Sequence, residues 1–328
     1  MKITNKNNKY LVNESEKKEL YVSELERSIN ILSSFMTPTQ LKNLKLDLQL
    51  EGETFNEAKY IQAACETSIS ATLANLYPNC FKYEHKVNPP KDVDCAFEVD
   101  GFQFNVEIKC ADYSKKNKID GENAFKLGAL GRLSDFQDVA KQLQELFENV
   151  EDSSGLVKKP LILQQHMDNK LKDFLLSAHS KFSSTIHLKT LNILVVCCDD
   201  TTDMKKWFHY MYGVQGLFRQ DSFHPNAEYN RVDVVILTNL YHRHYNYYEK
   251  DKVEGHWDFY NAFNLICSNP FRMADKKNEI IKLTNTIHNH SIELSQYKVP
   301  HELDELRIST YVVEELSNKG LYYFQPRI

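Results

Sequence analysis

The sequence is poor in the residues that interrupt regular structure. Its 328 residues include only 10 glycines and 9 prolines, whereas 42% of the chain is hydrophobic. Fibrous chains are rich in glycine and proline, and disordered chains are poor in apolar residues, so both classes are excluded. A chain of this length can form one large domain or two modest ones, and we expect one large core with helical additions.

The cysteines form no recognisable framework. There are seven, they are scattered, and no two have the C-x-x-C spacing. A disulfide scaffold and a structural zinc site are therefore not indicated, and a reducing compartment is the simplest setting. Cys197 and Cys198 end a short apolar run and point to opposite faces, so we interpret them as core residues and not as catalytic thiols.

Long apolar segments are also missing. The N-terminal stretch MKITNKNNKY lacks the apolar centre of a signal peptide, and the longest apolar run, residues 191–198, is interrupted by Asn192. A membrane-spanning helix needs about 20 apolar residues. We therefore expect a soluble, cytoplasmic protein with no membrane partner.

Three common nucleotide-binding and hydrolase motifs are absent. The sequence contains no G-x-x-x-x-G-K-[ST] loop, no G-x-G-x-x-G fingerprint and no G-x-S-x-G elbow, so ATP, dinucleotide and serine-hydrolase interpretations have no support. The formal net charge of -5 argues against a uniformly basic nucleic-acid surface. It still permits a local basic rim around an acidic metal site.

The most informative segment covers residues 92–110 and reads DVDCAFEVDGFQFNVEIKC. Polar and apolar residues alternate on both sides of Asp100-Gly101, a pair that fits the two positive-φ positions of a tight hairpin turn. Alternation places Asp94 on one face of the first strand, and Glu107 with Lys109 on one face of the second. Antiparallel pairing then brings the aspartate close to the glutamate and the lysine.

This pattern resembles the core of the PD-(D/E)xK, or restriction-endonuclease-like, nuclease superfamily. The resemblance covers residues 55–150: a helix, a strand with aspartate, a strand with Glu-x-Lys, and a second helix. It implies that Asp94 and Glu107 bind a metal ion, and that the backbone carbonyl of Ile108 is a further ligand. It also implies that Lys109 activates water or stabilises the transition state. Asp92 shares a face with Asp94 and is the alternative aspartate.

Many members add an acidic residue from the preceding helix, and some add a glutamine from the following one. Glu66 is the better match for the first by its distance from the next strand, and Glu57 is second; nine positions apart, they point to opposite sides of one helix. Gln137 matches the glutamine, although a polar surface position explains it equally well. The sequence departs from the pattern in two ways: Val93 replaces a proline, and Glu98 is an extra carboxylate.

Phosphodiester hydrolysis explains why these residue types belong together. Two carboxylates provide hard oxygen ligands for Mg²⁺ and leave positions open for water and substrate phosphate. The metal lowers the pKa of bound water and stabilises charge on phosphorus, while a nearby lysine orients or deprotonates that water. We expect Mg²⁺ as the cofactor, with Mn²⁺ as a substitute.

The tripeptide alone is not specific, because Asp/Glu-x-Lys occurs seven times in the chain. Only the copy that begins at Glu107 ends an alternating strand, follows an Asp-Gly turn and faces an aspartate on the neighbouring strand. The alternative is an ordinary exposed hairpin with solvated charges.

Apolar periodicity predicts the rest of the architecture. We expect an α/β fold: a restriction-endonuclease-like core with a mixed central sheet flanked by helices, plus a mostly helical C-terminal extension. The predicted divisions are an N-terminal helical segment (1–54), the core (55–245) and the extension (246–328). Predicted helices cover residues 20–35, 55–76, 134–150, 171–182, 258–266 and 274–292, predicted strands cover residues 81–87, 191–198 and 231–240 beside the hairpin, and residues 151–160 form a predicted linker.

Two other groups of residues invite functional hypotheses. Residues 109–118, with Lys126 and Arg132, form the densest basic stretch, which either contacts substrate phosphates or is a solvated loop. His242, His244 and His256 lie in an aromatic segment that fits base stacking or, as a rival hypothesis, a zinc site.

We therefore predict a Mg²⁺-dependent nuclease, specifically a DNA endonuclease of restriction or anti-phage defence. Cutting both strands of a duplex would call for a homodimer, and a defence-system partner protein is a possible regulator. The alternative is a non-catalytic nucleic-acid-binding or complex-scaffolding protein that retains the fold.

Overall fold

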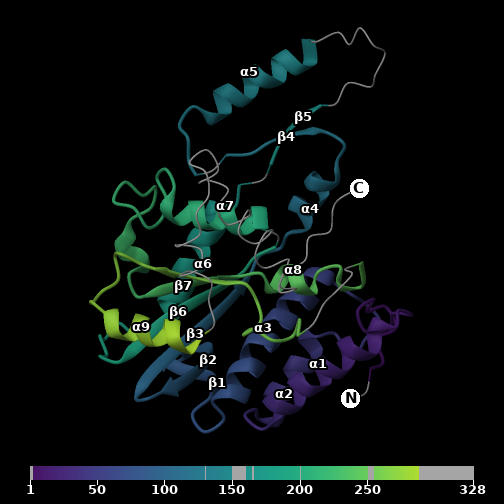
Figure 1. Cartoon of the computed structure of the whole chain (residues 1–328), viewed down its shortest axis with the longest axis vertical. Helices are drawn as coiled ribbons and strands as arrows, with labels where there is room; N and C mark the ends of the chain where they lie inside the picture. The colour runs from purple at the N-terminus through teal and green to yellow at the C-terminus, as the bar shows by residue number, and fades with distance from the viewer. Residues whose placement is uncertain are drawn as a thin grey trace.

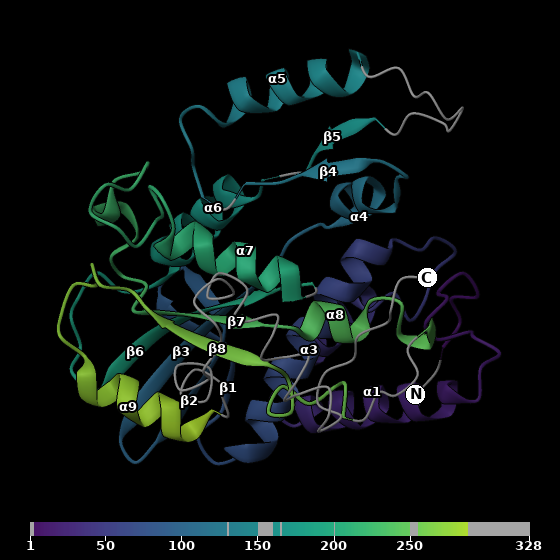
Figure 2. The same ribbon diagram turned by 45° about the horizontal axis from the view of Figure 1, so that its top comes forward.

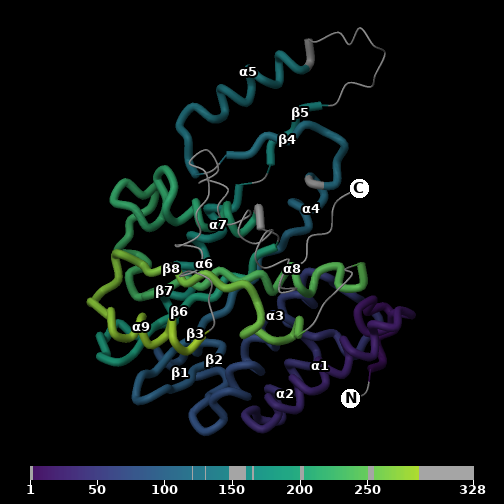
Figure 3. Tube along the Cα trace, in the orientation of Figure 1, coloured from purple at the N-terminus to yellow at the C-terminus, as the bar shows by residue number. Residues whose placement is uncertain are grey.

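A six-stranded mixed β-sheet forms the centre of the molecule in the computed structural model (Figure 1). The structure describes residues 3–129, 131–149, 160–164, 166–199, 201–249 and 255–287. The strands are β1 (Lys82–Asn88), β2 (Lys91–Val99), β3 (Phe102–Cys110), β6 (Thr190–Cys197), β7 (Val234–Thr238) and β8 (Asn264–Ser268). Figure 3 shows them in this order across the sheet. Strands β3, β6 and β7 are parallel, and the other neighbours are antiparallel.

Helices cover the sheet, as the predicted α/β architecture requires. They are α1 (Lys17–Ser33), α2 (Pro38–Asp47), α3 (Glu57–Leu76), α4 (Ser114–Gly121), α5 (Phe136–Asn149), α6 (Asp168–Lys181), α7 (Thr201–Tyr212), α8 (Leu240–His244) and α9 (Lys277–Thr286). Short 3₁₀ turns occupy Asn226–Tyr229 and Tyr247–Glu249. One hydrophobic core contains residues from Tyr10 to Ile287.

The predicted hairpin forms strands β2 and β3. Asp100 and Gly101 have φ values of 49° and 76°, so the turn uses the two positive-φ positions that the Asp-Gly pair predicts. The strands pair from Val99↔Phe102 to Cys95↔Val106. This register fixes which side chains share a face, because neighbouring residues of paired strands point the same way.

Contacts of two helices identify the two faces of the sheet. Cys65 of α3 interacts with Cys110 and Cys197, so α3 lies on the face that Cys110 shares with Ile108. Lys181 of α6 binds Glu107, so α6 lies on the opposite face. Figure 1 shows α1, α2 and α3 together on one side of the sheet and α6 and α7 on the other. Strand β3 is therefore buried on both faces.

A small lobe projects from this body. It consists of α5 and a two-stranded parallel sheet, β4 (Phe125–Leu127) and β5 (Leu161–Leu163), and it lies apart from the main sheet in Figure 2. Phe125 and Phe147 pack with ring centroids 4.9 Å apart. The predicted linker, residues 151–160, lies outside the described residues except for Pro160.

Most predicted elements are confirmed, but the segment 258–266 is not a helix. Residues Asn264–Ser268 instead form β8, which pairs antiparallel with β7 from Thr238↔Asn264 to Val234↔Ser268. Pairing with the edge of a buried strand satisfies the backbone of this short apolar run. Helices α2, α4, α7 and α8 were not predicted, although Thr37 and Gln40 form a capping box at the start of α2. Of the predicted helix 274–292, residues beyond 287 lie outside the described part.

In the described part of the chain, no helix is both long and apolar enough to cross a membrane.

A buried ion pair ties α9 to the start of β7. Asp233 is 1% exposed, and its carboxylate accepts hydrogen bonds from Lys276 Nζ at 2.7 Å and from the backbone N–H of Asn192 at 2.8 Å. Burial raises the pKa of Asp233, while the ammonium of Lys276 opposes that change. The carboxylate therefore depends on its partner to remain charged.

Replacing Lys276 by methionine should lower the free energy of unfolding by about 3 kcal/mol, because a buried carboxylate loses its counter-ion. Urea denaturation measures this change. Lys277→Met is the matched control, since Lys277 is the exposed neighbour on the same helix. Equal stabilities of the two variants would show that the ion pair contributes nothing.

Candidate functional site

Glu107 is the most deeply buried charged residue of the hairpin. Its side chain is 0% exposed in the centre of β3, and two lysines contact its carboxylate. Lys109 Nζ lies 2.6 Å from Oε1, and Lys181 Nζ lies 2.8 Å from Oε1 and 2.9 Å from Oε2. A buried carboxylate is tolerated only when it is paired in this way.

Asp94 lies opposite Glu107, where β2 and β3 stop pairing. The last pair of the register is Cys95↔Val106, and beyond it the backbone N–H of Ile108 donates a hydrogen bond to Asp94 Oδ2. The other oxygen, Oδ1, lies 4.0 Å from Lys181 Nζ. The structure thus brings together Asp94, Glu107 and Lys109, the three residues that the sequence pattern selects.

The carboxylates of this site repel one another. Burial and the charges of Glu107 and Glu66 raise the pKa of Asp94, against the opposing effects of Lys181 and the Ile108 N–H. Burial lowers the pKa of Lys181, but the neighbouring carboxylates of Asp94 and Glu107 outweigh burial and raise that pKa. Additional positive charge at this point would therefore be stabilising.

Glu66 of α3 approaches the same group from the other face of the sheet. Burial raises its pKa; a hydrogen bond from Gln62 at 3.2 Å and the charge of Lys109 lower it, while the charge of Glu107 contributes a further rise. Glu57, by contrast, contacts Lys9 at 2.7 Å and accepts a hydrogen bond from Tyr10, away from the site. The helix thus presents Glu66, the preferred match, to the carboxylates.

Gln137 is not brought to the carboxylates. It lies on α5 in the lobe and lines a hollow with Arg132, His166 and Asp168. The chain leaves β3 through α4 and β4 before it reaches α5. This first long helix after the hairpin therefore does not pack on the sheet. Of the helices that follow the hairpin, α6 packs beside β2, and its last residue is Lys181.

Lys181 was not predicted from the sequence. The helix was expected at residues 171–182, but a lysine in the last turn of a helix ordinarily interacts with the terminal carbonyls or with water. Its position 74 residues beyond Glu107 carries no local signal. Only the packing of α6 against the sheet reveals the contact.

The three histidines do not form one site. His242 Nδ1 lies 3.4 Å from Asp199, His244 Nε2 lies 2.9 Å from the Ser68 hydroxyl, and His256 Nδ1 lies 3.1 Å from Glu24. His244 and His256 are both buried among aromatic rings. The zinc hypothesis therefore has no common centre for these ligands.

The donor set at the hairpin fits a hard cation. Asp94 and Glu107 supply carboxylate oxygens, and the carbonyl of Ile108 lies between Glu107 and Lys109 in the chain. The described residues contain no cluster of three or more His, Cys, Asp or Glu side chains in metal-binding geometry. Mg²⁺ does not need one, because it commonly binds one or two carboxylates and keeps several waters.

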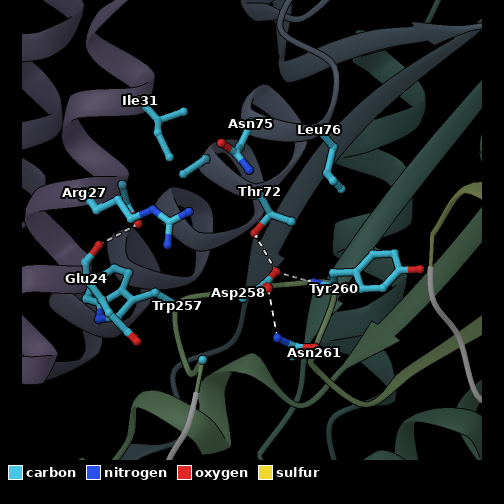
Figure 4. Close-up of a pocket in the computed structure, with 13 residues that line it drawn as sticks. Glu24, Arg27, Ile31, Thr72, Asn75, Leu76, Trp257, Asp258, Tyr260 and Asn261 are labelled. Carbon is cyan, nitrogen blue, oxygen red and sulfur yellow. Dashed lines mark hydrogen bonds between the residues drawn. The ribbon is translucent and has the colours of Figure 1, made fainter.

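Two hollows lie on α3 at different distances from the site. One, of about 520 Å³, is lined by Glu66, Gln62, Lys59 and Asp47 and so reaches the candidate site. The other, of about 380 Å³, lies between α1, α3 and residues 255–261 (Figure 4). There the Asp258 carboxylate accepts hydrogen bonds from Thr72, Tyr260 and Asn261, so it holds the surrounding segment in place.

Comparison of the chain with protein-family models, with curated protein sequences and with solved structures found no match. The interpretation of the site therefore depends on its geometry and on the sequence pattern.

Replacing Asp94 by asparagine should increase the free energy of unfolding of the metal-free protein at neutral pH. Since the folded state raises the pKa of Asp94, the carboxylate lowers stability as the pH rises above its unfolded value, and asparagine removes this charge but can still accept the Ile108 N–H. The gain should shrink as the pH falls toward ~4, where the carboxyl group is protonated in the folded state and already about half protonated in the unfolded chain.

Urea denaturation in EDTA at about pH 8 and about pH 4 tests this expectation. Glu98→Gln is the control, because Glu98 is an exposed carboxylate of the same strand. Destabilisation by Asp94→Asn at both pH values would show that Lys181 stabilises the charged carboxylate more than Glu107 and Glu66 destabilise it.

Proposed function

We propose that this chain is a Mg²⁺-dependent phosphodiesterase of the PD-(D/E)xK type that cleaves nucleic acid, DNA in preference to RNA. One observation carries the proposal. Asp94 and Glu107 face each other at the point where β2 and β3 separate, with Lys109 Nζ 2.6 Å from Glu107. Ordinary surface hairpins do not bury a carboxylate between two lysines.

Each side chain has a role that follows from its position. Asp94 Oδ1 and the Glu107 carboxylate would hold the cation, with the Ile108 carbonyl as a further donor. A bound Mg²⁺ would supply a water of lowered pKa and neutralise charge on the phosphate. Lys109 is 23% exposed, so its ammonium can orient that water from the solvent side of the site. Glu66 lies close enough to influence both carboxylates.

Basic residues that could bind substrate phosphates lie near the end of β3. Helix α4 begins four residues after this strand, and it exposes Lys115 and Lys118 to solvent. Lys116 is buried and binds Asp199 at 3.1 Å, so it has a structural role. The three lysines of α4 thus divide into one with a structural role and two exposed ones, which we propose for phosphate contact.

Restriction or anti-phage defence is the biological setting that we propose, by analogy with the superfamily. For cleavage of both duplex strands we expect two copies of the chain, each supplying one set of these residues. A defence-system partner protein is part of the same proposal.

A second candidate is a non-catalytic nucleic-acid-binding or scaffolding protein. The favouring observation is that Glu107 is 0% exposed and already paired with two lysines, so this carboxylate has counter-ions without a metal ion. A degenerate nuclease fold would have this property.

Cleavage assays distinguish the two candidates. Supercoiled plasmid, linear duplex, single-stranded DNA and RNA are incubated with Mg²⁺, Mn²⁺ or EDTA. Asp94→Asn and Glu107→Gln should abolish metal-dependent cutting because they remove metal ligands, and Lys109→Met should slow it by roughly 10²–10⁴-fold.

Glu98→Gln is the matched control, since Glu98 is an exposed carboxylate of the same hairpin. It should cut at the wild-type rate. Cutting that survives Glu107→Gln would overturn the assignment, and a folded wild type that binds DNA but cleaves none of the substrates would favour the non-catalytic candidate.

A further inference from the structure

Access to Glu107 is blocked by ammonium groups. Its side chain is 0% exposed, whereas the three polar residues around it, Asp94, Lys109 and Lys181, are each 23–27% exposed. Both carboxylate oxygens have a lysine within 2.9 Å. A cation can therefore reach this carboxylate only if one of the lysines moves away.

Lys181 is the lysine that occupies the position between the two carboxylates. Its Nζ lies 2.8 and 2.9 Å from the two oxygens of Glu107 and 4.0 Å from Asp94 Oδ1. Asp94 Oδ2 is engaged by the Ile108 N–H, so Oδ1 is the oxygen left to face a cation. Lys109 contacts Oε1 of Glu107 from the same strand, two residues further on.

Lys181 is also free to move. It is the last residue of α6, its side chain is 24% exposed, and its long flexible stem can carry the ammonium to solvent. Asp92 lies close enough to influence it electrostatically. A short swing would leave the ammonium at the rim of the site, where a substrate phosphate would lie.

We propose that Lys181 occupies the cation position in the metal-free protein, is displaced by the divalent ion, and then binds a phosphate of the nucleic acid. This inference rests on the proposed function. When the divalent ion replaces the ammonium of Lys181 at the carboxylates, Lys181 loses its counter-ions. A phosphate of the nucleic acid then takes their place. Metal binding and nucleic-acid binding therefore strengthen each other through this side chain.

Calorimetric titration of the full chain with Mn²⁺ tests the displacement without relying on activity. Lys181→Met removes the competing charge and should bind Mn²⁺ roughly tenfold more tightly than wild type or better, since even a modest change in charge interaction reaches this size. Lys181→Arg keeps the charge and can bind the Glu107 carboxylate with two hydrogen bonds, so its affinity should not exceed that of wild type.

Lys172→Met is the matched control. Lys172 lies on the same helix, is likewise 24% exposed, and forms an ion pair with Asp173 at 3.4 Å. Its Mn²⁺ affinity should equal that of wild type. Circular dichroism verifies that each variant is folded; Lys181→Met still leaves Glu107 paired with Lys109.

The second arm measures coupling with a short DNA duplex and Ca²⁺, a cation chosen to suppress cleavage. In wild type, the duplex should increase the affinity for Ca²⁺, and Lys181→Met should reduce this increase to the level that Lys109 and the α4 lysines provide. Lys172→Met should retain the full coupling.

The outcomes separate the two proposals. Equal Mn²⁺ affinities for wild type and Lys181→Met, with binding lost in Glu107→Gln, would refute the displacement and leave the proposed metal site intact. Absence of Mn²⁺ binding in every variant, Lys181→Met included, would refute the proposed metal-dependent function and the displacement with it.

Discussion

A carboxylate in the middle of a sheet has to be neutralised, and this requirement organises the candidate site. Glu107 is excluded from solvent between two helical layers, where an unpaired charge would be strongly destabilising. Lys109 comes from the same strand, and Lys181 comes from α6, which fixes that helix against the hairpin. The ion pairs that allow Glu107 to be buried are thus also the contacts that control access to its carboxylate.

The second constraint is the separation of β2 from β3 at Asp94. A continued ladder would have paired the Ile108 N–H with a backbone carbonyl, but the Asp94 side chain accepts it instead. The two oxygens of this carboxylate therefore differ: Oδ2 accepts the backbone N–H, and Oδ1 is the oxygen that we propose faces a cation. The mutual repulsion of Asp94, Glu107 and Glu66 is the structural cost of placing three carboxylates together, as expected at sites that bind a metal ion.

The arrangement also explains which helices contribute. Helix α3 supplies Glu66 from one face of the sheet and α6 supplies Lys181 from the other, whereas α5 remains in the lobe with Gln137. Order along the chain would assign α5 to the sheet, because it is the first long helix after the hairpin. Burial decides otherwise, since Leu171, Phe174 and Leu175 of α6 are buried in the core while Leu146 of α5 is 62% exposed.

The sequence by itself determined the hairpin and the faces of its strands. Period-two alternation and the Asp-Gly turn are local properties, so they placed Asp94, Glu107 and Lys109 together without knowledge of the fold. The distance from the following strand likewise favoured Glu66 over Glu57, and the helical period placed the two on opposite sides of the helix. Only the tertiary structure decided that Lys181 covers Glu107, that residues 264–268 form strand β8, and that the three histidines have different polar partners. These features depend on packing between segments far apart in sequence, and local periodicity carries no information about such partners.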